Sequence, residues 1–541
     1  MVDGYRLWGG EITKGMKERR IHEGRTALTF PDGPDTLFLA LEESASRYPE
    51  HTALVDDAGT PCSYWELYRR CEEFAAYLYC VCKLKRGAHA GVMMHNTVEY
   101  CVAFLALSKI SAVMVALPSK FKQKEVLSLA EKAEVELVVC DEMYRDWFLE
   151  KYPADRVLSS TEGIGRTGFD HLYKNWENRE PDTAFIRSFP PGLPGEEALI
   201  MFTSGTTSRS KGVLLKNYNI MHAVEVYRRI LGVTHRDVSV IVTPIYHITG
   251  LVALLGLFIR AGGTLYLHKR FDAVRVIQEA GIHGFTFFHA SPTVFNLILK
   301  AGEGMPEIPS LTTLACGSGN MSADKIRRLH RWLPNAQFHT VYGLTETSSP
   351  AAIFPGDSAV SPYIGAAGRP VPGVRVKIVD ENRKELPQGI PGEIALSGSC
   401  VLEGYYKKTV NELENGWLYT GDIGYFNEEQ YLYIVDRKKD MINRGGEKIW
   451  CYDVENEMEH MEGIQSAAVV GIPDEVYGES AAAVAELESG CHITAEEIQR
   501  YLAQRMAKYK IPVRIKLVES IPLTLNGKVD KRRIKEMLME D

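Results

Sequence analysis

Residues 201–213 read MFTSGTTSRSKGV, a turn dense in Ser, Thr and Gly between two apolar, strand-like runs. A phosphate-binding P-loop needs Gly directly before its Lys and Ser or Thr after it, whereas Ser210 precedes Lys211 and Gly212 follows it. The P-loop motif is therefore absent. Backbone N–H groups in a glycine-permitted turn, a lysine and several hydroxyls are still the donors that a polyphosphate requires. The segment predicts a phosphate cradle, and a plain surface loop is the alternative.

The flanking sequence alternates between helical and strand-like patterns. In residues 36–139, apolar residues recur at helical spacing in LFLALEESASRY and SYWELYRRCEEFAAYLY, while AGVMMH, AVMVAL and ELVVC are short and rich in β-branched residues. The same alternation returns in residues 197–342, and Ser322 is placed to cap the helix MSADKIRRLHRWL. Alternation of this kind predicts a layered α/β sheet.

Two changes of pattern follow along the chain. After Pro350, turns rich in Gly and Pro separate the period-two strands VRVKIVD, EIALSG and YLYIVD, which predicts a small β-subdomain. After Asp436, helices and strands mix again over about the length of a small independent domain.

Composition excludes several classes of protein. The chain has 541 residues, 45% hydrophobic and 24% charged, which is too long for a small stapled scaffold and too apolar for a disordered protein. Its 62 basic and 70 acidic side chains leave a net charge of −8, so no nucleic-acid partner is expected. The ten cysteines form no CxxC pair, which favours the reducing cytoplasm. The N-terminus shows no signal peptide, and the apolar runs at 100–118 and 248–259 predict buried core rather than integral membrane association.

Four further segments carry residues suited to nucleotide chemistry. YGLTET, residues 342–347, follows the strand FHTVY and so lies at the carboxyl end of a sheet strand, where open α/β sheets bind ligands. WLYTGDIG, residues 417–424, holds Asp422 in a tight turn suited to a ribose diol. DRKKDMINRGG, residues 436–446, and NGK, residues 526–528, complete the set.

With these five motifs in this order, the sequence resembles the adenylate-forming superfamily, which includes acyl-CoA synthetases, adenylation domains of peptide synthetases and luciferases. The resemblance extends from about residue 36 to residue 533. It implies a large α/β N-terminal domain with a distorted β-barrel, residues 1–438, and a small mobile α+β C-terminal domain, residues 439–541, pivoting at Lys439. It also implies ATP, Mg²⁺ and coenzyme A as co-substrates.

The resemblance implies roles for individual residues. Lys528 bridges the substrate carboxylate and the α-phosphate, Thr345 contacts the α-phosphate, Glu346 holds Mg²⁺, and His247 gates the acyl pocket. Coenzyme A passes Gly445 and Gly446. The implied ATP-binding residues are Thr203, Ser204, Gly205, Thr206, Thr207 and Lys211 at the phosphates, Gly317, Ser318, Gly319, Tyr342 and Gly343 at adenine, and Asp422 and Arg437 at the ribose.

The sequence also departs from the family pattern. Ser208 and Ser210 replace a glycine and a proline of the phosphate loop, and Cys451 replaces a proline after Ile449. The adenine turn reads CGSGNM, residues 316–321, which puts Gly319 and Asn320 at the floor of the acyl pocket.

The chemistry agrees with the resemblance, because a carboxylate is already ionised at neutral pH and needs charge neutralisation rather than a general base to attack the α-phosphorus. The leading hypothesis is an AMP-forming acid:coenzyme A ligase. A stand-alone adenylation enzyme that loads a carrier-protein thiol, and a non-catalytic nucleotide-binding protein, are the alternatives. The acid is a fatty acid or a small acid such as carnitine or crotonobetaine, since TTSRSKGV, RGGEKIWCYDVE and MAKYKIP are similar to carnitine/crotonobetaine-CoA ligases. The chain could also form a homodimer, and the sequence does not decide this.

Overall fold

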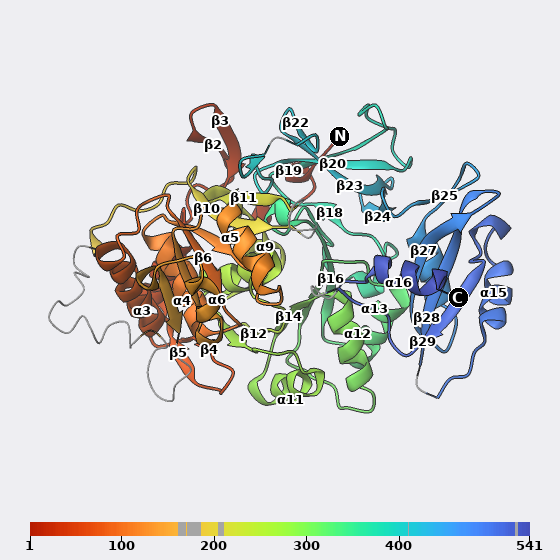
Figure 1. Cartoon of the computed structure of the whole chain (residues 1–541), viewed down its shortest axis with the longest axis horizontal. Coiled ribbons are helices and arrows are strands. Elements are labelled where there is room, and N and C mark those ends of the chain that lie inside the picture. Colours follow the sequence, from red (N-terminus) through yellow and green to blue (C-terminus); the bar gives the residue numbers. More distant parts are fainter. Residues whose placement is uncertain are drawn as a thin grey trace.

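The computed structural model describes residues 1–160, 169, 186–203, 210–408, 410–488, 490–524 and 528–540. Figure 1 shows a broad body, coloured from red to cyan, with a smaller blue unit at one end. We call the blue part, residues 442–540, the C-terminal unit and the rest the large unit. The layered α/β architecture expected from the alternating sequence pattern is confirmed.

The first layer of the large unit is a mixed seven-stranded sheet with strand order β21-β11-β10-β7-β6-β8-β9. Strands β6 to β8 are wholly buried, which explains their continuous apolar sequences. The strands are β6 (His89–Met93), β7 (Val113–Ala116), β8 (Leu137–Asp141), β9 (Val157–Ser160), β10 (Glu197–Phe202), β11 (Gly212–Lys216) and β21 (Gly404–Tyr405). The helices of this half of the chain are α2 (Leu37–Arg47), α3 (Tyr64–Ala76), α4 (Val98–Lys109), α5 (Gln123–Lys132), α6 (Arg145–Leu149), α9 (Asn217–Ile230) and α10 (Leu257–Ala261).

Two further sheets form the second half of the α/β region. One has the order β12-β13-β4-β5 and the other β14-β15-β16-β17-β18. Their strands are β4 (Thr52–Val55), β5 (Pro61–Ser63), β12 (Val238–Ile241), β13 (Thr264–Leu267), β14 (Phe287–Ala290), β15 (Thr313–Cys316), β16 (Gln337–Tyr342), β17 (Ala352–Ile353) and β18 (Arg369–Pro370). The helices are α11 (Ala273–His283), α12 (Pro292–Ala301) and α13 (Ala323–Trp332).

The predicted N-cap of α13 is correct in its position, but its capping hydrogen bond is not formed. Ser322 occupies the N-cap position with extended backbone, as the sequence indicates, but its side chain makes no capping hydrogen bond. The hydroxyl is buried and has no partner within the described part of the chain. The position of the helix start was therefore predictable, whereas the bond was not.

The predicted β-subdomain is an antiparallel sheet with the order β1-β19-β20-β23-β22, to which β24 adds beside β23. Its strands are β1 (Val2–Asp3), β19 (Val374–Val379), β20 (Gly392–Gly398), β22 (Leu413–Glu414), β23 (Trp417–Phe426) and β24 (Leu432–Arg437). It is an open half-barrel, where the resemblance implied a distorted barrel. The hairpin β2 (Lys17–His22) and β3 (Arg25–Thr29) was not predicted.

The C-terminal unit is a five-stranded sheet of order β26-β25-β28-β27, with β29 beside β28. Separate apolar clusters form around α14 and α15 and around α16. Its elements are β25 (Ile442–Arg444), β26 (Glu447–Ile449), α14 (Cys451–Glu459), β27 (Ile464–Asp474), β28 (Gly478–Leu487), α15 (Ala495–Ala503), β29 (Arg514–Val518) and α16 (Lys531–Met539). The expected domain boundary at 438/439 falls between β24 and β25 and remains a prediction.

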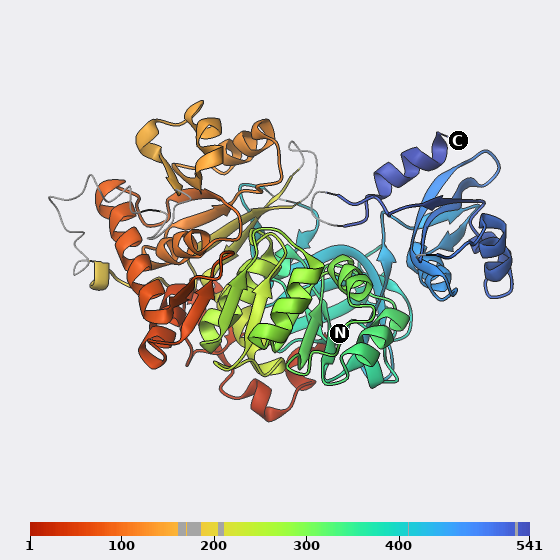
Figure 2. The same ribbon diagram turned by 90° about the horizontal axis from the view of Figure 1, so that it is seen from below.

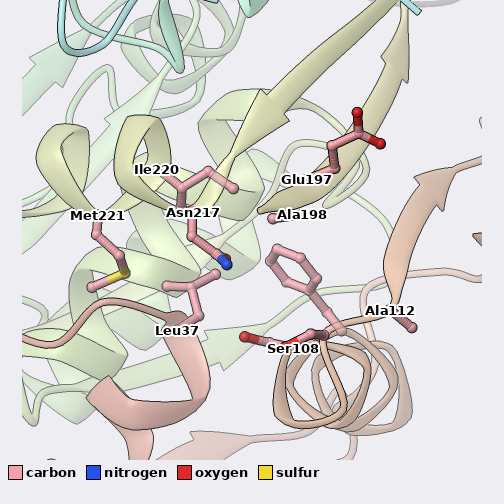
Figure 3. A pocket seen from close by; sticks show the side chains of 10 residues that line it. Leu37, Ser108, Ala112, Glu197, Ala198, Asn217, Ile220 and Met221 are labelled. Carbon is pink, nitrogen blue, oxygen red and sulfur yellow. The ribbon is translucent and has the colours of Figure 1, made fainter. Parts of the chain in front are cut away.

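Four general features bear on function. In the described residues, no helix is long and apolar enough to cross a membrane, and no group of three or more His, Cys, Asp or Glu side chains is arranged to hold a metal ion. All ten cysteines are free thiols. Figure 3 shows a small cavity between α2, α4 and α9, with Asn217 and Ser108 turned toward it. Its volume of about 10 Å³ is the room of roughly one water molecule.

The buried side chain of Asn96, which follows β6, forms hydrogen bonds that link the seven-stranded sheet to the segments after β12 and β13. Its amide nitrogen lies 3.3, 3.0 and 2.8 Å from the carbonyl oxygens of Ile241, Thr243 and His268, and its oxygen accepts from the Ile245 N–H at 2.8 Å. Because a polar group buried without a partner costs about 1–3 kcal/mol, Asn96→Leu should destabilise the large unit by about 3 kcal/mol. Thermal unfolding measures this. An unchanged melting temperature would contradict the role of Asn96 as a fastening residue.

Candidate active site

The predicted phosphate cradle connects two antiparallel strands, β10 and β11. Its base is closed by the Thr203 N–H, which donates to the Lys211 carbonyl at 3.1 Å. Ser210 is buried, and its carbonyl accepts from the Lys132 ammonium. The remaining predicted loop residues, namely Ser204, Gly205, Thr206, Thr207 and Ser208, lie outside the described residues.

Lys211 lies at the centre of a charged cluster. Its ammonium pairs with the Glu412 carboxylate and lies 5.4 Å from the centre of the Tyr405 ring. The Tyr405 hydroxyl in turn donates to Glu346 at 3.1 Å. The pKa of Glu412 is lowered by its hydrogen bond to Lys211, against the opposing effect of burial. The cation predicted to bind phosphate is therefore paired with a protein carboxylate in this structure.

Asp422 joins three separate elements. The Tyr342 hydroxyl, at the end of β16, donates to Asp422 Oδ2 at 2.8 Å. Arg437, the last residue of β24, places Nε 3.1 Å from Asp422 Oδ1, and the two residues are direct partners in the β23–β24 ladder. The structure thus brings together the predicted adenine residue and both predicted ribose residues.

Two site carboxyls are held in a low-dielectric setting. Burial raises the pKa of Asp422, whereas Arg437 and the Tyr342 hydroxyl act in the opposite direction. Burial also raises the pKa of Glu346, while its hydrogen bonds and the Lys211 and Arg437 cations lower it. Raised carboxyl pKa values in a cleft are typical of functional sites.

The YGLTET segment turns sharply after β16. A Cβ on Gly343 would lie 1.4 Å from the Ser349 carbonyl oxygen, so glycine is required there. Thr345 and Glu346 begin the short 3₁₀ turn Thr345–Thr347. The neighbouring adenine turn is also tight, because a Cβ on Gly317 would lie 3.2 Å from the Val341 carbonyl oxygen, and Ser318 has a positive φ of 69°. Gly319 and Asn320 are exposed beside them.

Lys528 comes from the C-terminal unit, and the segment that carries it reaches back to the large unit (Figure 2). Its pKa is lowered by desolvation and by the Arg437 guanidinium, while Asp422 and Glu346 raise it. The ammonium therefore shares the electrostatic environment of the carboxylates of the large unit. Asn526 and Gly527, the other members of the NGK motif, lie outside the described residues.

His247 faces the same region from the large unit. Its Nε2 atom is buried and has no hydrogen-bond partner among the described residues. Burial lowers the pKa of His247 to about 4, and the Lys528 and Lys120 cations contribute in the same direction. The ring is therefore neutral at pH 7 and lies near two ammonium groups.

A hydrogen bond joins the two units across the predicted hinge at Lys439. Asp436, one residue before Arg437, accepts from the Arg437 N–H at 2.7 Å and from the Cys451 N–H at 2.6 Å. Cys451 is the first residue of α14, so this carboxylate satisfies a free donor at the helix N-terminus. Proline, the family residue there, has no N–H to donate. The exposed Lys439 lies between the two bonded residues.

Gly445 and Gly446 lie apart from this cluster, on the β25–β26 hairpin. Both have positive φ, 60° and 95°. The Gly445 N–H donates to the Tyr477 carbonyl at 2.8 Å, and the Arg444 guanidinium lies 3.9 Å from the centre of the Tyr477 ring. The predicted coenzyme A channel residues thus pack within the C-terminal unit.

Three residues near the site were missed by sequence reasoning. Tyr405 and Glu412 contact Glu346 and Lys211 across more than fifty residues of chain, and Lys120 acts on His247 from a distant loop. None belongs to a recognisable motif. Tyr405 reaches the site through the pairing of β21 with β11, Glu412 through the segment before β22, and Lys120 through the loop after β7. A prediction of strand pairing would have been needed to find them.

Comparison with known proteins agrees with this geometry. The AMP-binding enzyme family matches residues 41–406, and the AMP-binding enzyme C-terminal domain matches residues 453–528. An oxalate–CoA ligase of Arabidopsis thaliana is 28% identical over 94% of this chain and 99% of its own. A 2-succinylbenzoate–CoA ligase of Bacillus velezensis is 29% identical over 92% and 97%. The crystal structure of ATP-bound MatB from Rhodopseudomonas palustris has a TM-score of 0.81 and 27% identity, covering 93% and 98% of the two chains.

The chain therefore belongs to the AMP-binding enzyme family, the adenylate-forming superfamily that the five motifs indicated. Within it, the chain falls in the acyl-CoA ligase branch and is an AMP-forming acid–thiol ligase.

The low pKa of His247 predicts how the folding stability of the protein depends on pH. The folded protein holds this ring neutral down to about pH 4, whereas the unfolded chain takes up its proton near pH 6.5. The unfolded state thus binds more protons between these values, so stability is lost as the pH falls from about 6.5 to about 4. In His247→Gln, melting temperature should fall less steeply over this window than in wild type. Equal slopes in the two proteins would contradict the assignment.

Proposed function

We propose that this enzyme activates a carboxylic acid with ATP, holds the acyl adenylate between its two units, and transfers the acyl group to coenzyme A. The observations that carry this proposal are the family assignment and the geometry that joins Tyr342, Asp422 and Arg437. Lys528 of the C-terminal unit lies within electrostatic range of the same residues, because Asp422 and Glu346 raise its pKa. The free thiols agree with a cytoplasmic setting.

In this proposal the nucleoside lies against Asp422, Arg437 and Tyr342. Each Asp422 oxygen already has one partner, Tyr342 or Arg437. An ionised carboxylate has about four lone-pair sites, so it can accept both hydroxyls of a ribose as well. Adenine stacks on Tyr342 beside the turn at Gly317, Ser318 and Gly319, where a side chain on Gly317 would crowd the Val341 carbonyl.

The phosphates lie over the 203–211 loop and Lys211. Glu412 is the partner of Lys211 in this structure, and an incoming polyphosphate competes for the same cation. Phosphate carries more charge than a carboxylate and presents more acceptor oxygens, so it displaces Glu412. The loop thereby exchanges an internal ion pair for one with ATP.

Mg²⁺ enters this site with ATP. The residues fit it, because Glu346 presents a partly buried carboxylate beside Lys211 and hard oxygen ligands are those that Mg²⁺ prefers. One protein carboxylate is enough, since Mg²⁺ usually keeps several waters and phosphate oxygens. When bound, the ion neutralises phosphate charge.

The adenylation step needs no general base from the protein. An oxygen of the ionised acid attacks the α-phosphorus, the bond to the β-phosphate oxygen breaks, and pyrophosphate leaves with the electron pair. Lys528 and Thr345 neutralise and orient the α-phosphate oxygens, where negative charge gathers.

Thioester formation follows on a rotated arrangement. The sulfur of coenzyme A attacks the acyl carbonyl, AMP leaves with the former acid oxygen, and the thiol proton passes to solvent. Rotation at Lys439 withdraws Lys528 and brings the Gly445–Gly446 hairpin to the site. Two glycines with positive φ leave a narrow path open for a thin pantetheine chain.

The acyl substrate in this proposal is a fatty acid or a small acid such as carnitine or crotonobetaine. Support comes from the three short segments that are similar to carnitine/crotonobetaine-CoA ligases. In this proposal His247 gates the acyl pocket, and its low pKa keeps the ring neutral at pH 7. Gly319 and Asn320 would form the exposed floor.

A carrier-protein thiol is the second candidate acceptor, because the segment NGKVDKR, residues 526–532, resembles peptide-synthetase adenylation domains. The mass of the acylated product separates the two acceptors. A product formed with coenzyme A alone supports the first proposal, and one formed only with a phosphopantetheinylated carrier protein supports the second.

A screen of acids tests the proposed function. Fatty acids of several chain lengths, carnitine, crotonobetaine and small dicarboxylic acids are each incubated with ATP, Mg²⁺ and coenzyme A, and free thiol is followed. Thiol loss with stoichiometric AMP for one of these acids supports the proposal. Pyrophosphate release without thiol loss would point to another acceptor.

Lys528→Ala should reduce adenylate formation by at least about a hundredfold, the scale found when a donor to developing charge is removed. Thioester formation from a supplied acyl adenylate should change by less than about threefold, because Lys528 acts only at the α-phosphate. The acid selected by the screen is used, and the half-reactions are measured separately. Equal losses in both would contradict the assigned role.

Glu346→Gln should raise the Mg²⁺ concentration needed for half-maximal adenylation by about tenfold, since an amide oxygen is a weaker ligand than a carboxylate for a hard cation. A Mg²⁺ titration of pyrophosphate release measures this. Glu412→Gln is the matched control, because it alters a nearby carboxylate that pairs with Lys211 rather than with the metal. If the Mg²⁺ requirement rises in Glu412→Gln but not in Glu346→Gln, Glu346 is not the metal ligand.

A further inference from the structure

Two ion pairs join helix α13 of the large unit to the C-terminal unit. Lys325 Nζ lies 2.8 Å from Glu459 Oε1, and both side chains are about nine-tenths buried, with 10% and 12% exposed. One helical turn later, Arg328 lies 2.7 Å from Glu488 Oε1, with about a third of each side chain exposed. Figure 1 shows α13 on the side of the large unit that faces the blue sheet.

Glu459 is an unfavourable residue for its own helix. It is the last residue of α14, where the helix dipole disfavours negative charge. Its Oε1 atom also accepts weakly from the Ala467 N–H at 3.3 Å and the Ser466 hydroxyl at 3.4 Å, which fix the carboxylate against β27. A buried carboxylate at a helix C-terminus needs a counter-charge, and the counter-charge comes from the other unit.

No buried apolar cluster of the described residues spans the two units. Each apolar core cluster in the described residues lies wholly on one side of the hinge, either before residue 435 or after residue 441. Polar contacts therefore determine how the C-terminal unit sits. The Asp436–Cys451 hydrogen bond lies at the hinge itself. The two α13 ion pairs lie away from the hinge, where they can fix the orientation of the C-terminal unit relative to the large unit.

We propose that Lys325 and Glu459, supported by Arg328 and Glu488, are positioning residues that hold the C-terminal unit in the arrangement that delivers Lys528 to the ATP crevice. This inference rests on the proposed function of Lys528. Rotation about the hinge separates the pair and returns both charges to water. The pair therefore favours the adenylating arrangement and must be broken before the thioester step.

Binding of Mg²⁺·ATP to the whole enzyme, measured by calorimetry at fixed salt, tests the inference without knowledge of the acid. Lys325→Glu and Glu459→Lys should each weaken ATP binding by about tenfold, because like charges then face each other and Lys528 is withdrawn. The double charge reversal should restore affinity to within about twofold of wild type. Lys300→Glu, an exposed charge change on neighbouring α12, should have no effect.

The same single reversals in a Lys528→Ala background separate positioning from general damage. A residue that acts through Lys528 should then change ATP affinity by less than about twofold, whereas a residue that merely supports the fold would weaken it equally in both backgrounds. Melting temperatures report on folding. If a charge reversal does not fold, Lys325→Met and Glu459→Gln replace it.

Single reversals that bind ATP as wild type does, or a double reversal that stays weak, would overturn the inference. Equal losses in the two backgrounds would also overturn it. Failure of the proposed function gives a different result: wild-type enzyme that does not bind ATP removes the proposed function and this inference with it. Lys528→Ala that binds ATP as tightly as wild type overturns this inference alone, because the role of Lys528 at the developing charge of adenylation is tested separately.

Discussion

The candidate site depends on the hydrogen bond and the ion pair that the buried carboxylate of Asp422 makes. One oxygen accepts from the end of the α/β strand β16 through Tyr342, and the other faces Arg437 on the last strand before the hinge. Asp422 is almost wholly buried, with 4% exposed. Without these partners a buried charge would carry a large desolvation cost. One charged group therefore joins the α/β sheet to the last two strands of the half-barrel.

The layered fold could be predicted because its signals are local. The runs around β6, β7 and β8 are short, apolar and β-branched, and these strands are buried on both faces. Thr36, Ser63 and Thr97 each cap the helix that follows, as their position before an apolar helical pattern indicates. Such features depend on a few neighbouring residues, so they survive in any tertiary context that buries the apolar face.

What the sequence did not indicate is set by long-range contacts. Glu412 reaches Lys211 over 201 positions of chain, and Tyr405 reaches Glu346 over 59. The Tyr405 contact follows from the addition of the two-residue strand β21 to β11, and a strand that short leaves almost no pattern in the sequence. Glu412 precedes the equally short β22 and is held by the Tyr419 N–H, which donates to its carbonyl. The Asp436–Cys451 bond is similar: the departure from proline was visible, but its consequence depends on where α14 begins.

The polar character of the boundary between the units has an energetic reason. The proposed cycle uses two arrangements of the C-terminal unit, and both must be accessible, so neither can be favoured by more than a few kcal/mol. At roughly 25 cal/mol per Å², an apolar interface of about 400 Å² would favour one arrangement by about 10 kcal/mol and arrest the cycle. In a buried ion pair the Coulomb attraction is largely offset by the lost hydration of both charges, so returning both charges to water has a much smaller net cost. Contacts such as Lys325–Glu459 can therefore select one arrangement without making it permanent.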